Sequence, residues 1–102
     1  MIQVVASIEV KKQSWEGFLK IFQSNVPNVL AESGCHRYEA TVDHLMNLPL
    51  QDLSPHRVTV LETWESEMHL RDHLVSPHMA TYRENVKDMV EGVSLRVLRS
   101  VS

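Results

Sequence analysis

Cysteine is nearly absent from this chain: Cys35 is the only one among 102 residues. A single cysteine cannot form an intramolecular disulfide, so we expect a protein of a reducing compartment and place it in the cytoplasm. Glycine and proline are also scarce, with 3 and 4 residues, while 43% of the residues are hydrophobic. That composition is typical of a folded domain and excludes a disordered chain.

Long apolar runs and clusters of positive charge are missing as well. No stretch approaches the roughly 18 consecutive apolar residues of a membrane span, so we expect no membrane partner. The ten lysines and arginines are scattered and outnumbered by thirteen acidic residues, and the net charge is -3. A nucleic-acid partner is therefore not expected. The opening MIQVVASIEV reads as a strand rather than as a signal peptide.

Hydrophobic periodicity predicts four strands and three helices. The expected strands cover residues 2–10, 35–44, 57–65 and 93–101. The expected helices cover residues 14–32, 66–75 and 77–91. Pro27 lies inside the first helical pattern, so we expect a kink or a break near Asn25. Residues 45–55 contain two prolines and no clean period, which predicts a loop.

This order of elements predicts one α+β domain over residues 1–102 with the β-α-β-β-α-β pattern of a ferredoxin-like fold, an antiparallel sheet with helices on one face. The first strand has a mixed side and an apolar side, the latter formed by Ile2, Val4, Ala6, Ile8 and Val10. If the helices cover the mixed side, the apolar side needs a partner presenting the same surface. A chain this short buries little more than roughly 60% of its unfolded surface. We therefore expect a homodimer through the sheet faces.

Two stretches resemble a known family. They are ESGCHRYEA, residues 32–40, and LETWESEMHLRDHLVSPHM, residues 61–79. With the opening strand they resemble the antibiotic biosynthesis monooxygenase (ABM) family of dimeric α/β barrels, in which a Glu-x-Trp strand end precedes a helix carrying His and a Ser-Pro-His-like turn. The resemblance covers nearly the whole chain. It implies a ligand pocket between the sheet and the helices of each subunit.

The same resemblance places individual residues. Ser7, Trp64 and His73 fall where the family has pocket residues. The haem-degrading members carry an Asn on the first strand, a Trp on a helix and a His on the following helix, and these positions here read Ser7, His73 and Arg83. The resemblance therefore disfavours haem, and we expect no cofactor.

His73 and His78 are the candidate catalytic bases. On a helix with about 100° per residue, His73 shares a flank with inward-facing Leu70. His78 falls near the start of the last helix, where the positive end of the helix dipole favours the neutral imidazole; simple packing at that turn is the alternative. His69 lies one turn before His73, and such a pair can bind a metal. A metal site needs a third ligand, and only Glu62 or His78 is a candidate for it. We therefore expect no metal and a solvated position for His69.

Three further residues complete the predicted binding set. Trp64 and Tyr82 offer aromatic surface for a flat ligand, with core packing as the alternative. Glu62 stands on the same strand face as Trp64, and a buried carboxylate is costly unless it is paired. A structural salt bridge is therefore favoured over a direct role in binding. The candidate partners of Glu62 are Arg37, Arg57 and Arg83.

The leading functional hypothesis is a cofactor-independent monooxygenase acting on a quinol, anthrone or polyketide phenol. His73 or His78 removes the phenolic proton, and Ser7, Trp64 and Arg83 are candidates to stabilise the anion. Electron transfer from the anion to O2 then leads through a peroxide to a quinone.

Two alternatives stay open at this stage. One is an isomerase of a small phosphorylated carbonyl compound, with Arg71 or Arg83 holding the phosphate. The other is a dimeric protein that binds a small aromatic molecule without turnover. Two or more cations at the pocket mouth favour the isomerase, a dry aromatic slot favours the oxygenase, and a slot without a reachable histidine favours the binder.

Overall fold

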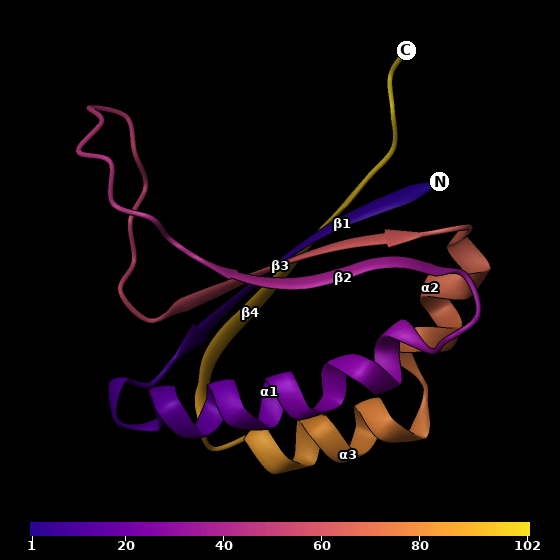
Figure 1. Ribbon diagram of the computed structural model, residues 1–102, viewed down its shortest axis with the longest axis horizontal. Coiled ribbons are helices and arrows are strands. Elements are labelled where there is room, and N and C mark those ends of the chain that lie inside the picture. The colour runs from indigo at the N-terminus through magenta and orange to yellow at the C-terminus, as the bar shows by residue number, and fades with distance from the viewer.

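The computed structural model describes residues 1–102, and it confirms the ferredoxin-like α+β fold (Figure 1). The strands are β1 (Ile2–Val10), β2 (Cys35–Val42), β3 (Arg57–Trp64) and β4 (Val90–Leu98). The helices are α1 (Trp15–Leu30), α2 (Glu67–Leu74) and α3 (Pro77–Val86), and the short 3-10 turn Lys12–Ser14 precedes α1. No helix is both long enough and apolar enough to cross a membrane.

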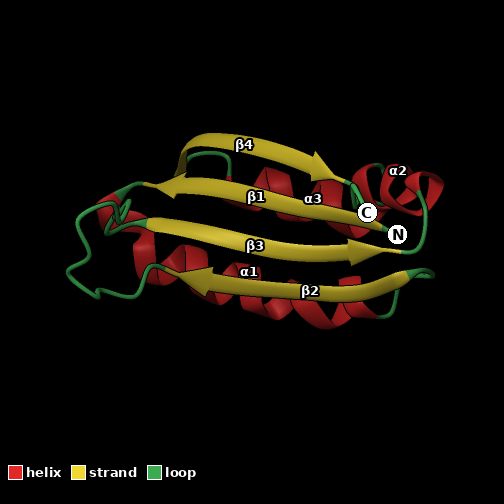
Figure 2. Cartoon of the chain, turned by 90° about the horizontal axis from the view of Figure 1, so that it is seen from above, coloured by secondary structure: helices red, strands yellow, loops and turns green.

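The four strands form one antiparallel sheet in the order β2-β3-β1-β4, and the helices lie together on one side of it (Figure 2). β1 lies in the middle and pairs Ile2 with Trp64 of β3 and Val5 with Arg96 of β4. β4 is an edge strand, so one of its two backbone edges is unpaired.

The helices cover the apolar side of β1, not its mixed side. Side chains alternate along a strand, and Val4, Ala6 and Ile8 are buried against α1 residues such as Phe18 and Phe22. The condition from which the homodimer was argued is therefore not met. The open face carries the mixed side of β1, and homodimerisation stays a prediction.

β4 is partly uncovered on the helix side of the sheet. Val93, Leu95 and Val97 point to the helix side of the sheet, because they pair with the inward residues of β1. They are nevertheless 62%, 51% and 55% exposed. The helices cover the centre of the sheet, and this edge strand lies beyond them.

The structure differs most from the sequence prediction inside α1 and at the junction of α3 and β4. α1 runs through Pro27 without a break, because Phe22 and Val29 on either side of it are buried in the core. α3 ends at Val86, and Val90 already belongs to β4. Pairing of Val90 with Val10 of β1 ends the helical pattern several residues before Gly92.

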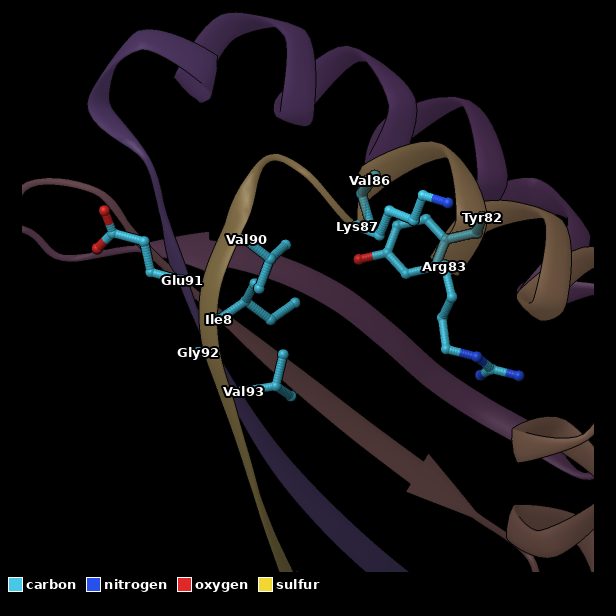
Figure 3. Close-up of a pocket in the computed structure, with 9 residues that line it drawn as sticks. All are labelled: Ile8, Tyr82, Arg83, Val86, Lys87, Val90, Glu91, Gly92 and Val93. Carbon is cyan, nitrogen blue, oxygen red and sulfur yellow. The ribbon is translucent and has the colours of Figure 1, made fainter.

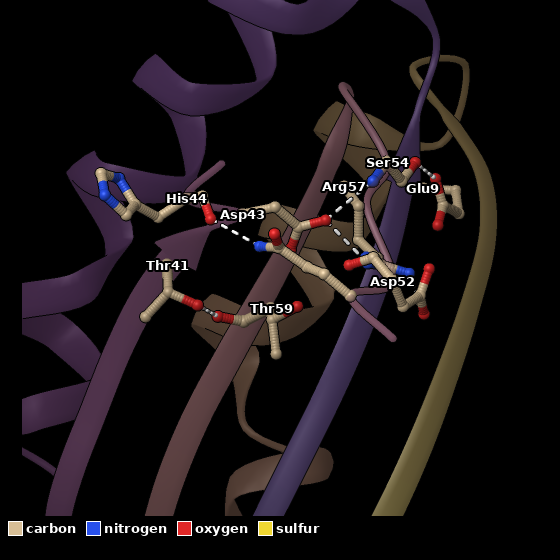
Figure 4. Close-up of polar contacts among 9 residues, drawn as sticks. Glu9, Thr41, Asp43, His44, Asp52, Ser54, Arg57 and Thr59 are labelled. Atoms are coloured by element: carbon tan, nitrogen blue, oxygen red, sulfur yellow. Dashed lines mark hydrogen bonds and ion pairs between the residues drawn. The ribbon is translucent and has the colours of Figure 1, made fainter. Parts of the chain in front are cut away.

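The long β2–β3 connection, residues 43–56, is fixed by a polar cluster at its base (Figure 4). Arg57 Nη2 lies 2.7 Å from Asp43 Oδ2, and Arg57 Nη1 lies 3.1 Å from Asp52 Oδ2. Asp43 Oδ2 also accepts a hydrogen bond from the backbone N–H of Ser54. The tip of the loop exposes Leu45, Met46, Leu48 and Leu50.

Candidate functional site

An apolar cavity of about 190 Å³ lies between the sheet and the helices. Ten of its 13 lining residues are hydrophobic, and the other three are Glu62, His73 and Arg83. The aromatic part of the lining comes from Phe22, Tyr38 and Tyr82. Such a cavity suits a small aromatic molecule, since apolar cavities of about 150 Å³ bind benzene.

A groove of about 290 Å³ adjoins the cavity and opens along β4 (Figure 3). Ile8, Tyr82, Arg83 and Val93 line both spaces. In Figure 3, the ring of Tyr82 extends from α3 towards the strand that carries Val90 and Val93. The groove and the cavity therefore share part of their walls.

His73 is the buried histidine of this cavity, with 2% of its surface exposed. It stands on the inward flank of α2 with Leu70, and its ring lies 4.6 Å from that of Trp64, centroid to centroid. Nδ1 is 2.7 Å from Glu32 Oε2, so Nδ1 carries the hydrogen and donates it to the carboxylate. Nε2 then keeps its lone pair. Burial lowers the pKa of His73, which keeps the ring neutral near neutral pH.

Glu32 was not predicted as a site residue. Glu32 lies just after the C-terminal end of α1. Its carboxylate is within hydrogen-bond distance of His73, which is 41 positions away in the sequence. One signal was available: a carboxylate beside the negative end of a helix dipole is unfavourable without a compensating partner. His73 is that partner.

His78 lies beside the same carboxylate. Its Nε2 is 3.0 Å from Glu32 Oε2, but the ring is turned so that neither of its buried nitrogens makes a hydrogen bond. His78 does not line the apolar cavity. It lines a separate crevice between α1 and α3, together with Asn25 and Asn28.

Glu62 is buried in the cavity wall without a cation. Its Oε1 accepts a hydrogen bond from Trp64 Nε1 at 2.9 Å, and burial raises its pKa to about 7. The expected salt bridge was wrong, because every candidate arginine has another partner. Arg37 pairs with Glu39, Arg57 with Asp43 and Asp52, and Arg83 donates to the Leu74 carbonyl.

The remaining predicted residues divide between the cavity and other places. Tyr82 and Arg83 line the cavity, and burial raises the pKa of Tyr82 to about 12. Trp64 is fully buried, so it offers no exposed face and instead contacts Glu62 and His73. Ser7 lies on the opposite face of the sheet, because it alternates with the cavity residues Ala6 and Ile8.

Tyr38 is a cavity residue that the sequence did not single out. Its ring stacks on Phe22 at 5.7 Å and meets His73 edge-on at 5.6 Å, and burial raises the pKa of its phenol. His69 bonds Ser66 through Nδ1 and does not reach the cavity. No group of three or more His, Cys, Asp and Glu side chains is arranged to hold a metal ion.

Known proteins resemble this chain at three levels. Residues 1–85 match the family model described as "Antibiotic biosynthesis monooxygenase". The "Probable quinol monooxygenase YgiN" of Escherichia coli K12 is 37% identical over 101 residues, which are 97% of each chain. A conserved protein from Methanosarcina mazei superposes with a TM-score of 0.82 at 25% identity, over 97% of this chain and 91% of that one. A structure from Nitrosomonas europaea has a TM-score of 0.83 over 100% of both chains at 19% identity, a likeness of fold alone.

Proposed function

The chain belongs to the antibiotic biosynthesis monooxygenase family, and we propose that it is a cofactor-independent monooxygenase that oxidises a small quinol or aromatic phenol with O2. One observation carries the proposal: a buried, neutral His73 held by Glu32 lines an aromatic cavity. Nε2 of His73 is the base in this scheme. The cavity volume favours a substrate with one or two rings, and larger phenols extend into the adjoining groove.

The demanding step is removal of the phenolic proton. A phenol with a pKa near 10 and an ordinary histidine near 6.5 differ by about 3.5 units, or about 5 kcal/mol. The lowered pKa of His73 widens that difference. Three groups at the cavity reduce that difference. Glu32 stabilises the imidazolium through Nδ1, Arg83 brings positive charge to the rim, and the protonated form of Glu62 donates a hydrogen bond to the phenolate.

Oxygenation then follows from the electron-rich phenolate. The anion passes one electron to O2, and the resulting radicals combine at the carbon para to the oxygen, forming a carbon–oxygen bond. The peroxide anion takes back the proton held by His73, and the resulting hydroperoxide loses water, with the hydrogen of the same ring carbon, to give a quinone. One oxygen atom of O2 enters the product and the other leaves as water, so the substrate itself supplies the electrons.

The residues that line the cavity favour a monooxygenase over a phosphosugar-type isomerase or a binding protein without turnover. Its only cationic residue is Arg83, whereas a phosphate substrate calls for more positive charge. Lys87 lines the adjoining groove, but its Nζ pairs with Glu84 Oε1 at 2.7 Å. The histidine within reach of a ligand favours an enzyme over a binding protein.

The test is oxygen uptake with a panel of naphthols, dihydroxynaphthalenes and anthrones, using metal-free protein. Wild type is compared with His73→Ala and with a matched control, His44→Ala, because His44 is exposed on the β2–β3 loop. We expect uptake above that of buffer for wild type and the control, and loss in His73→Ala. If no compound is oxidised faster than in buffer, or if His73→Ala equals wild type, the proposal fails.

We also propose that the chain forms a homodimer through the open face of the sheet. Half-buried Val5 and Leu61 pair across β1 and β3 on that face and give it an apolar centre. Charged side chains such as Arg37 and Glu39 surround it. Light scattering is expected to give twice the 11.7 kDa of one chain at micromolar concentration, and Val5→Lys is expected to shift the mass to one chain. A stable monomer in wild type would contradict this.

A further inference from the structure

Tyr38 and Glu62 are direct neighbours in the wall of the apolar cavity. The register of β2 and β3 pairs Tyr38 with Glu62, so the two side chains leave the sheet on the same face. Both residues line the cavity, as does His73. The ring of His73 meets Tyr38 edge-on at 5.6 Å and lies 4.6 Å from the ring of Trp64, to which Glu62 is hydrogen-bonded. The base, the phenol and the carboxyl group therefore surround one part of the cavity.

The hydroxyl group of Tyr38 makes no hydrogen bond within the protein. Its oxygen is nevertheless open to a neighbouring space, because the only enclosed side-chain nitrogens and oxygens without a partner are the two of His78. Only 7% of Tyr38 is exposed and the residue lines the cavity, so the open hydroxyl faces the cavity. A buried hydroxyl without a partner is costly, and an oxygen atom of a bound ligand removes that cost.

The ring of Tyr38 is held from two directions. It stacks on Phe22 with an interplanar angle of 9° at 5.7 Å, and His73 contacts it edge-on. The hydroxyl is thus presented in one position, and a donor fixed in advance needs no reorganisation during the reaction. Burial, followed by the nearby acidic groups of Glu62 and Tyr82, raises the pKa of the Tyr38 phenol. Tyr38 therefore keeps its hydrogen and acts as a donor.

We propose that Tyr38 is a catalytic residue that donates a hydrogen bond to the phenolic oxygen of the substrate and stabilises the phenolate formed when His73 takes the proton. This inference rests on the proposed function. A donor directed at the oxygen on which negative charge develops stabilises the anion more than the neutral phenol. No bond to Tyr38 forms or breaks. The proton of the substrate passes to Nε2 of His73 and later returns to the peroxide, while Tyr38 keeps its own proton throughout.

Tyr82, the other tyrosine of the cavity, is placed differently. Its ring packs against Phe18 and Phe22 and makes no ring contact with His73. Figure 3 shows the ring of Tyr82 directed from α3 towards the strand that carries Val90, which lines the adjoining groove. The tyrosine beside the base is therefore Tyr38.

The kinetic test uses Tyr38→Phe, which keeps the ring and its stack on Phe22. Oxygen uptake at saturating naphthol is expected to show kcat lowered about tenfold or more, with a smaller change in KM, because the hydrogen bond strengthens as the anion forms. Ser100→Ala, which removes an exposed hydroxyl after β4, is the control and should behave as wild type. The midpoint of urea unfolding should be unchanged or higher in Tyr38→Phe. An unchanged kcat, or a lower midpoint, would overturn the role of Tyr38.

A second test is independent of turnover and uses 4-nitrophenol, whose absorbance distinguishes phenol from phenolate. The probe is titrated from pH 5 to pH 9 with saturating protein. The midpoint of its ionisation is expected about one pH unit higher when it is bound to Tyr38→Phe than to wild type. The same shift is expected in a Glu62→Gln background, where no carboxyl group beside Tyr38 titrates. Equal midpoints with and without the hydroxyl, or no binding of the probe by wild type, would contradict the proposal.

The two tests separate the role of Tyr38 from the function on which it rests. Absence of oxygen uptake by wild type removes the proposed function, and the 4-nitrophenol titration still decides whether Tyr38 stabilises a bound phenolate. Oxygen uptake by wild type with the same kcat and the same probe ionisation in Tyr38→Phe keeps the monooxygenase and removes the role of Tyr38.

Discussion

Glu62→Gln is expected to stabilise the protein at alkaline pH and to have little effect at pH 5. The amide keeps an oxygen that accepts the hydrogen bond from Trp64 Nε1, so the substitution removes mainly the ability to ionise. Burial raises the pKa of Glu62 from 4.5 to about 7 in the folded state. Between these values the folded protein binds more protons than the unfolded chain, so stability falls as pH rises.

The pKa shift of Glu62 sets the size of the stability difference between Glu62→Gln and wild type. A shift of about 2.5 units corresponds to about 3 kcal/mol, reached in full above pH 8 and absent below pH 4.5. Because His73 and the other groups titrate in both proteins, the difference between variant and wild type isolates Glu62. The variant should therefore be more stable by up to about 3 kcal/mol at pH 8.

Urea unfolding at several pH values from 5 to 9, at one fixed protein concentration, measures this difference. Glu16→Gln on the exposed side of α1 is the matched control and should show no trend with pH. A difference between Glu62→Gln and wild type that stays constant from pH 5 to pH 9 would refute the reasoning. It would mean that Glu62 is solvated or paired.

Three other changes test parts of the structure. Gly34→Ala should lower the free energy of unfolding by about 1–3 kcal/mol, since Gly34 has φ +79° and a Cβ there would collide with the His69 ring; unchanged urea unfolding would contradict this. Arg57→Met should speed limited proteolysis within residues 43–56, because it frees Asp43 at the base of the loop, and an unchanged cleavage pattern would speak against that anchoring. Burial lowers the pKa of His73, so wild type should lose stability relative to His73→Gln as pH falls below about 6.5; parallel stability curves in urea would show that the ring is not buried as described.

The fold could be predicted because its signals are local. Alternation in residues 2–10 and helical spacing in the later segments each need only a few neighbouring residues to be recognised. The position of the helices on the sheet could not be predicted in the same way. Alternation in β1 identifies two unlike faces, whereas packing of α1 determines which face is covered.

A site residue could be predicted where its position on its own helix or strand determines the direction of its side chain. His73 was placed on the inward flank of its helix by angular position relative to Leu70, and the structure has it buried there. Glu32 was missed because it meets His73 only through tertiary packing. The predicted salt bridge of Glu62 was wrong for a related reason. The arginines pair with nearer acidic side chains or donate to backbone carbonyls, and these contacts cannot be recognised from the charges along a sequence.

Labelling with oxygen-18 gas tests the central claim most directly. Metal-free wild type is incubated with a naphthol or dihydroxynaphthalene whose para carbon is free, and the quinone is trapped by reduction before its oxygen exchanges with water. Mass spectrometry is expected to find one labelled oxygen atom in the product, formed by wild type and His44→Ala and not by His73→Ala. A product without label, or labelled product formed equally by His73→Ala, would contradict a monooxygenase in which His73 is the base.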